Sequence, residues 1–224
     1  MFKKGEHYII KLSEDLSLLD FFVNKVENFN FEGEKIIKKE YNDSFVKAIY
    51  INYEPLDIEE DDEPIYIVKN EVNFTIDTDK NYLYYLAEER NSFFEDFLKR
   101  FFVEIEYVHF DNNYFKRFLL LNKMLAPIQV HIQVLNGTFI KDVAEIDFES
   151  PYNPLSHYKK NKIDADIKKI VFLYDPEYQI RFTIHRKGKV DIDSNLKEGY
   201  SIKILRFIVD SYNKYKKGVD CFDE

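Results

Sequence analysis

The sequence predicts an α+β fold in which one structural unit occurs twice. Two offsets between matched apolar positions support this prediction. The strand expected at residues 72–76, with the turn, short strand and apolar helix positions after it, recurs 108 residues later from residues 180–184 onward. The strand expected at residues 7–12 and the helix after it recur 98 residues later, from residues 105–110 onward. Such a repeat predicts a molecule with approximate twofold symmetry.

The first half is expected to begin with a strand followed by a helix. Ser13 is a good helix N-cap, because its hydroxyl accepts a hydrogen bond from a backbone N–H group of the first turn. Apolar residues then recur at helical spacing from Leu16 to Val26. Asn91 or Ser92 can cap a second helix in the same way. The expected elements are strands at residues 6–12, 31–37, 45–53, 65–76 and 82–86, and helices at residues 16–26 and 93–102.

The second half is expected to repeat this order. Asp111 is the predicted cap of its first helix, and Pro127 ends that helix, because a proline disfavours helical geometry at the residue before it. The Asn136-Gly137 pair is typical of a tight hairpin turn. A second hairpin turn is expected at Lys187-Gly188. The expected elements are strands at residues 103–110, 128–135, 139–148, 167–172, 178–184 and 190–192, and helices at residues 112–125 and 199–215.

Each half is therefore expected to read β-α-β-β-β-β-α, with residues 1–103 as the first repeat and residues 104–224 as the second. Side chains alternate between the two faces along a strand. In the second half this alternation separates apolar residues from Gln129, His131 and Gln133. We expect helices to cover the apolar face of one curved antiparallel sheet and to leave its polar face open to solvent.

Length and composition restrict the class of protein. The chain has 224 residues, of which 45% are hydrophobic, so it can bury a core and is not expected to be disordered. Its single cysteine, Cys221, excludes an internal disulfide. No apolar run is long enough for a signal peptide or a membrane span. These features predict a soluble cytoplasmic protein, and the Lys-, Asn- and Ile-rich composition is typical of an AT-rich, bacterial genome.

Charge is distributed unevenly along the chain. The net charge is −9, with 13 basic and 23 acidic residues in the first half. Residues 54–63 include seven acidic residues and no basic one. Such a run is most often a solvated loop, which extends because its charges repel one another. The alternative is that it occupies a basic surface, on a partner or on the second half of the chain.

The segment at residues 181–190, RFTIHRKGKV, combines a strand, a glycine-lysine turn and a second strand, and it leads into the helix that ends near Tyr215. This hairpin, and the order of elements over nearly the whole chain, resemble the saddle fold of the TATA-box-binding protein. The resemblance implies two similar halves that build one curved antiparallel sheet, with helices on its convex side. That family binds DNA with a basic sheet face, whereas this chain is acidic.

The polar sheet face of the second half is the best candidate binding surface. Lys and Arg side chains neutralise phosphates, and amide side chains reach base edges. The same residues are equally typical of an ordinary charged hairpin. The matching positions of the first half, Asn73, Thr75 and Asp77, are neutral or acidic, so a symmetric nucleic-acid saddle is not expected. The candidate residues are Gln129, His131, Gln133, Arg181, Thr183, His185, Lys187 and Lys189.

Two functions follow from this surface. The first is a non-catalytic recognition or adaptor subunit that docks a partner on its open sheet face, and the acidic chain favours a protein partner. The second is a nucleic-acid-binding protein that uses the basic hairpin. A third and less favoured hypothesis is a metal-dependent hydrolase with His131, His185 and Asp191. The sequence holds no Gly-rich phosphate loop and no zinc-ligand spacing, so no catalytic, cofactor or metal residue is assigned.

Overall fold

In the computed structural model, the chain folds into two compact units. The first comprises Met1–Phe2 and His7–Val108, and the second Lys3–Glu6 and His109–Glu224. We describe each unit by itself. The residues that the structure describes are 5–12, 30–31, 33–42, 44–55, 66–87, 89–101, 105–121, 126–136, 139–147, 165–174, 180–193 and 199–218.

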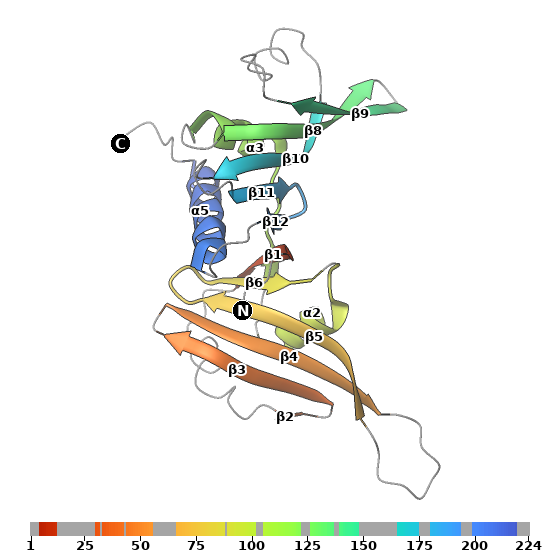
Figure 1. Ribbon diagram of the computed structural model, residues 1–224, viewed down its shortest axis with the longest axis vertical. Helices are drawn as coiled ribbons and strands as arrows, with labels where there is room; N and C mark the ends of the chain where they lie inside the picture. Colours follow the sequence, from red (N-terminus) through yellow and green to blue (C-terminus); the bar gives the residue numbers. More distant parts are fainter. Residues whose placement is uncertain are drawn as a thin grey trace, which may run out of the picture. The chain divides into compact units, whose positions relative to one another are not determined.

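The strands of the first unit pair in an antiparallel manner throughout. Neighbouring strands follow the order β2, β3, β4, β5, β6 and β1, and β7 also pairs with β1. Figure 1 shows β3 to β6 side by side, in orange and yellow. The elements are β1 (Gly5–Leu12), β2 (Asn30–Phe31), β3 (Glu34–Asn42), β4 (Phe45–Pro55), β5 (Tyr66–Asp77), β6 (Tyr82–Leu86), α2 (Ser92–Phe101) and β7 (Ile105–Tyr107).

Aromatic side chains fill the core between one face of this sheet and α2. The Phe94 ring lies 5.1 Å from Phe74 and 5.3 Å from Tyr85, measured between ring centroids. Tyr50 packs against Phe94 and Phe97 at 5.4 and 4.8 Å. All five side chains are buried. The alternation of apolar residues in β4, β5 and β6 therefore determines which face of the sheet α2 covers.

Helix α2 begins where the sequence predicts. The Asn91 Oδ1 atom accepts a hydrogen bond from the Phe94 backbone N–H at 3.0 Å, so Asn91 is the N-cap. At the other end of the helix, Arg100 Nη2 donates to both carboxylate oxygens of Glu34, at 2.6 and 2.5 Å. Tyr50 donates its hydroxyl to Glu34 Oε1 at 2.6 Å. The buried carboxylate of β3 is thus held by the sheet and by the helix together.

The opposite face of the first unit's sheet is not open as predicted. The register places Ile9 opposite Tyr84, and Tyr84 opposite Thr75, so these three residues share that face. Thr75 is only 3% exposed, and Ile9 and Tyr84 are fully buried. Asp77, on the same face, is 1% exposed, and its carboxylate accepts a hydrogen bond from the Tyr84 hydroxyl at 3.4 Å. A solvated polar face is therefore wrong for this part of the first half.

The second unit is also built from antiparallel pairs, with neighbours in the order β9, β8, β10, β11 and β12. Figure 1 shows α5, in blue, and α3, in green, with these strands. The elements are α3 (Asn112–Leu121), β8 (Ala126–Asn136), β9 (Phe139–Asp147), β10 (Ala165–Tyr174), β11 (Ile180–His185), β12 (Lys189–Asp193) and α5 (Gly199–Lys216).

The core of the second unit joins both helices to the apolar face of the sheet. Phe182 of β11 stacks on Phe172 of β10 at 5.2 Å. Phe118 of α3 meets Phe172 edge-on at 5.1 Å and Phe207 of α5 at 5.7 Å. Asp111 caps α3 as predicted, because its Oδ1 atom accepts a hydrogen bond from the Tyr114 backbone N–H at 2.7 Å. Aromatic side chains from α3, α5 and the sheet thus pack together in one core.

The prediction of a mixed α+β chain with antiparallel strand pairing is confirmed. The five strands that the sequence predicts between the two helices of the second half are present, as β8 to β12, so the summary order β-α-β-β-β-β-α omits one strand of this half. Their arrangement also differs from a simple meander. β9 pairs with β8 and lies outside it, and the chain then passes to β10 on the other side of β8. The internal duplication stays a prediction.

Candidate functional site

The register of three strands assembles a polar face on the second unit. Val171 lies directly opposite Thr183, and Thr183 opposite Asp191. Lys169 lies opposite His185 and Leu173 opposite Arg181 in the same ladder. Since opposed residues share a face of the sheet, these side chains form one surface, away from buried Phe172 and Phe182. We call it the polar face; it comprises Lys169, Val171, Leu173, Arg181, Thr183, His185 and Asp191.

The centre of the polar face is less polar than its edges. Val171, Leu173 and Thr183 are neither buried nor fully exposed. Arg181 beside them is exposed, and Lys169 and His185 are partly exposed. Val171 and Leu173 therefore form a small, partly exposed apolar area, with the charged Arg181 opposite Leu173 and Lys169 in the same strand.

Strand β8 brings the predicted residues of the other hairpin into the same ladder. His131 lies opposite Lys169, Gln129 opposite Val171, and Gln133 opposite Asp166. In this register they lie in one row with His185 and Thr183, although the residues belong to hairpins about 50 residues apart. Their side chains lie outside the part of the structure that can be described, so the register is what connects them to the polar face.

A hydrogen-bonded pair of a histidine and a carboxylate occupies one edge of the polar face. His185 Nε2 and Asp191 Oδ2 lie 2.6 Å apart. Burial opposes ionisation of Asp191, but the hydrogen bond and charge of His185, with the nearby Lys189 and Lys169, outweigh burial and lower the pKa of the carboxyl group. Lys189 forms an ion pair with Glu6 of the same unit. The charge of Lys189 is therefore balanced inside the protein.

The turn between β11 and β12 is built as the sequence predicts. Gly188 has a φ angle of +76°, which glycine adopts without strain. Lys187 at the turn is exposed. Arg186, in contrast, forms an ion pair with Asp166 at 2.7 Å, and Asn112 donates to the same carboxylate at 2.8 Å. Of the basic residues in this hairpin, Arg181 and Lys187 are those that present charge to solvent.

The pairing of Asp166 predicts a pH-dependent contribution to stability. Burial raises the pKa of this carboxyl group, but hydrogen bonds from Arg186 and Asn112 and the charges of Arg186 and Lys168 lower it overall. The folded pKa then lies below the unfolded value of about 3.9, so the contribution is present above about pH 4 and lost as the pH falls through the folded pKa. We expect Asp166→Asn to destabilise at neutral pH, by an amount that shrinks at acidic pH.

Denaturant unfolding between about pH 3 and pH 7 measures this difference. The exposed Glu71, replaced by Gln, is the matched control and should change stability at neutral pH by no more than about 0.5 kcal/mol, as surface substitutions usually do. A destabilisation by Asp166→Asn that is constant over the whole range would contradict the assigned role of the Arg186 pair.

The structure offers little for a metal-dependent hydrolase. Among the described residues, no group of three His, Cys, Asp or Glu side chains could hold a metal ion. His185 and Asp191 form the pair described above, and the His131 side chain is not described. His7 is buried, whereas His109 is exposed. His157, Cys221 and residues 56–63 of the acidic run lie outside the described residues.

Sequence reasoning missed several residues of the polar face. Lys169, Val171 and Leu173 are in a strand whose alternation is interrupted by register shifts near Ile167 and Phe172, which conceals the polar side.

No described helix is long and apolar enough to cross a membrane. The chain matches no protein-family model and no curated protein sequence.

Proposed function

We propose that the chain is a non-catalytic recognition subunit that binds a protein partner on the polar face. The observation that carries this proposal is the row of partly exposed Val171, Leu173 and Thr183 on the polar face, with the charged Lys169 and Arg181 beside it. Protein interfaces combine an apolar centre with a polar rim. Arg181, an exposed residue of the polar face, belongs to the residue types that contribute most binding energy in such interfaces.

The charges of the polar face favour a partner with acidic groups. Lys169, Arg181 and the adjacent Lys187 are basic, while Asp191 is paired with His185 and Asp193 is the position opposite Arg181 in the ladder. A nucleic-acid site needs several cations aimed at phosphates. Here Arg186 and Lys189 are engaged by Asp166 and Glu6, which supports the protein partner over the nucleic acid.

The proposal predicts that a partner retained from a lysate of the native host depends on the polar face. We expect Arg181→Ala and Thr183→Arg to weaken retention by at least about tenfold, as loss of a central interface residue does. Lys203→Ala, on the exposed side of α5, is the control and should retain the partner fully. Quantitative affinity capture with the four proteins measures this.

Two further arms of the experiment separate the kinds of partner. Retention should persist after nuclease treatment and should depend weakly on salt, since an apolar centre contributes. Retention that disappears with nuclease, or falls steeply with salt, would assign the polar face to nucleic acid instead. Equal retention by all four proteins would remove the polar face as the binding surface.

A further inference from the structure

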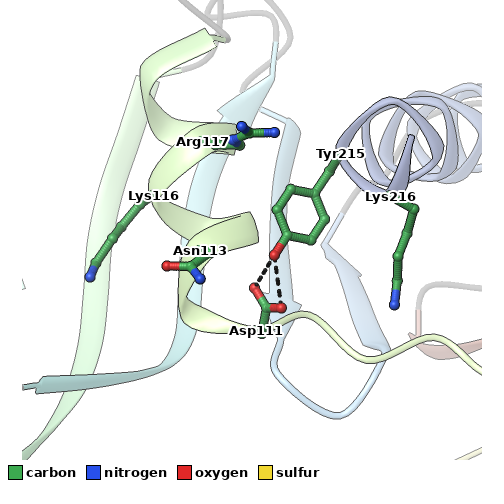
Figure 2. Close-up of a pocket in the computed structure, with 6 residues that line it drawn as sticks. All are labelled: Asp111, Asn113, Lys116, Arg117, Tyr215 and Lys216. Atoms are coloured by element: carbon green, nitrogen blue, oxygen red, sulfur yellow. Dashed lines mark hydrogen bonds between the residues drawn. The ribbon is translucent and has the colours of Figure 1, made fainter. Parts of the chain in front are cut away.

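An open pocket of about 500 Å³ lies between α3 and the last turn of α5 in the second unit. Figure 2 shows the Tyr215 hydroxyl donating to both carboxylate oxygens of Asp111, at 2.9 and 2.8 Å. The side chains of Lys116 and Lys216, which also line the pocket, point away from each other. The charged groups of the pocket therefore do not converge on a common ligand. Surface features of the first unit do converge, near the start of β5.

Among the described residues, three large hydrophobic side chains are exposed: Ile67 at 44%, Val68 at 54% and Phe93 at 46%. All three belong to the first unit. Ile67 and Val68 are neighbours near the start of β5. Lys69 connects this segment to α2, because its Nζ atom lies 5.6 Å from the centroid of the Phe93 ring. Exposed apolar side chains that gather in one place mark interaction sites, whereas scattered ones do not.

Strand β5 has an unpaired edge at the same place. It pairs with β4 from Tyr66 to Asp77, but with β6 only from Asn73 to Asp77. No described strand pairs with residues 66–72 on the β6 side of β5, and Figure 1 shows β4 and β5 continuing together beyond β6. We call residues 66–72 the open edge. Such an edge is a template for pairing with another chain.

Val68 directs its backbone groups to the open edge. The Tyr53 N–H donates to the Gly33 carbonyl, so Tyr53 directs its backbone groups to the side of β4 that is away from β5. Tyr53 lies opposite Val68. The two residues are therefore a non-hydrogen-bonded pair, and the N–H and C=O groups of Val68 point away from β4. The Val68 N–H is thus a donor that β4 does not use.

The charge around the open edge is acidic. Glu71 is exposed, and the Lys69 ammonium pairs with Glu54 at 2.7 Å. Arg90, on the chain that leads into α2, lies over the Tyr107 ring of β7 at 3.9 Å. The segment that joins β4 to β5 adds six acidic residues and no basic one: Asp57, Glu59, Glu60, Asp61, Asp62 and Glu63. These charges attract a basic segment and repel a second copy of this chain, which would bring the same acidic residues.

The two faces of the sheet differ beside the open edge. Val68 and Ile67 point to opposite faces, as consecutive residues of a strand do. Glu54 shares the Ile67 face because it lies opposite Ile67. Lys69 pairs with Glu54 and lies over the Phe93 ring, so this aromatic ring is near the same face. An added strand presents alternate side chains to the two faces, so apolar side chains suit the Val68 face and basic ones suit the carboxylate and the aromatic ring.

We propose that the open edge binds an extended segment of a partner protein in which apolar and basic residues alternate. The segment adds as a strand beside β5, and its backbone pairs with groups such as the Val68 N–H. Its apolar side chains cover Val68, and its basic side chains lie on the face that carries Glu54. The contact is independent of the polar face, because it involves only residues of the first unit.

The probe is a capped peptide of about eight residues, the length of an ordinary strand, in which lysine and valine alternate. We expect saturable binding to the full chain at low salt, measured by fluorescence anisotropy. Methylation of every backbone nitrogen of the peptide removes its hydrogen-bond donors and should weaken binding at least about tenfold. A peptide that alternates lysine and serine carries the same charge without the apolar side chains and should also bind at least about tenfold more weakly.

Val68→Pro tests the edge from the side of the protein, because proline has no N–H and β4 does not use the one that is lost. We expect this variant to bind the peptide about fivefold more weakly or worse, since a carbonyl of the peptide loses its donor. Val68→Thr keeps the N–H and nearly the same shape, and should bind within about threefold of the parent. Hydrogen exchange gives a direct readout, because the Val68 amide should exchange more slowly when the peptide is bound.

Several outcomes would overturn the proposal. Equal binding of the methylated peptide or of the lysine-serine peptide would show general attraction to an acidic chain, and unchanged exchange of the Val68 amide would show that no strand is added. A dimer of the parent that Val68→Pro dissociates would assign the open edge to a second copy. Melting temperatures check the fold, and if Val68→Pro does not fold, the methylated peptide and hydrogen exchange still decide. None of these measurements involves the polar face, so their failure is distinct from failure of the proposed function.

Discussion

Replacing Phe74 or Phe182 with Ala is expected to lower the free energy of unfolding of the unit that carries it by about 3–5 kcal/mol. Both rings are buried, at 3% and 1% exposure, and each packs against a further aromatic ring. Truncation removes the transfer free energy of the ring and leaves a cavity that the surrounding sheet and helices cannot fill. Denaturant unfolding of the parent and the variants measures the loss.

Phe93 is the matched control for this experiment. It is the same residue type, stands next to Phe94 in α2, and is 46% exposed. Phe93→Ala should therefore change stability much less than Phe74→Ala, because little apolar surface leaves water at that position on folding. Equal losses for the buried and the exposed phenylalanine would show that the apolar alternation does not define the core.

Arg100→Met is expected to cost about 2–3 kcal/mol, because it removes charged hydrogen bonds from a buried carboxylate. The Glu34 side chain is 10% exposed and would keep the hydrogen bond from the Tyr50 hydroxyl. Burial and the adjacent carboxylate already raise the pKa of that phenol. Methionine preserves much of the length of arginine, so the loss reports the missing ion pair.

Lys99→Met, one residue earlier in α2, provides the control. Lys99 pairs with Asp96 at 2.9 Å, but both side chains are more than half exposed, and exposed pairs contribute little. We therefore expect unfolding of Lys99→Met to resemble that of the parent. If Arg100→Met also leaves the free energy of unfolding unchanged, Glu34 is solvated well enough without its ion pair. The contact between β3 and α2 then does not stabilise the fold.

Local chemistry made much of the fold predictable from the sequence. Asn91 and Asp111 cap α2 and α3 because their short side chains reach the N–H groups of the first turn. Gly188 permits the tight turn of the last hairpin. The alternation around Phe182 identified the buried face of β11. Each of these features depends on neighbours within a few residues.

Features that depend on distant parts of the chain were not predictable in the same way. Thr75 and Asp77 are buried, which their polar side chains do not predict. The position of β9 outside β8 depends on a long connection, because residues 148–164 separate it from β10. Lys116 and Lys216 line one pocket although they are 100 residues apart. Strand register and helix packing, which no local pattern reports, produce these arrangements.

The central claim is that the polar face binds a protein, and dissociation constants for the purified complex test it most directly. The partner retained by the parent would be purified and titrated against the parent, Arg181→Ala, Thr183→Arg and Lys203→Ala. The account predicts binding at least about tenfold weaker for the two polar-face variants and unchanged for Lys203→Ala. Dissociation constants that are the same for all four proteins would contradict it.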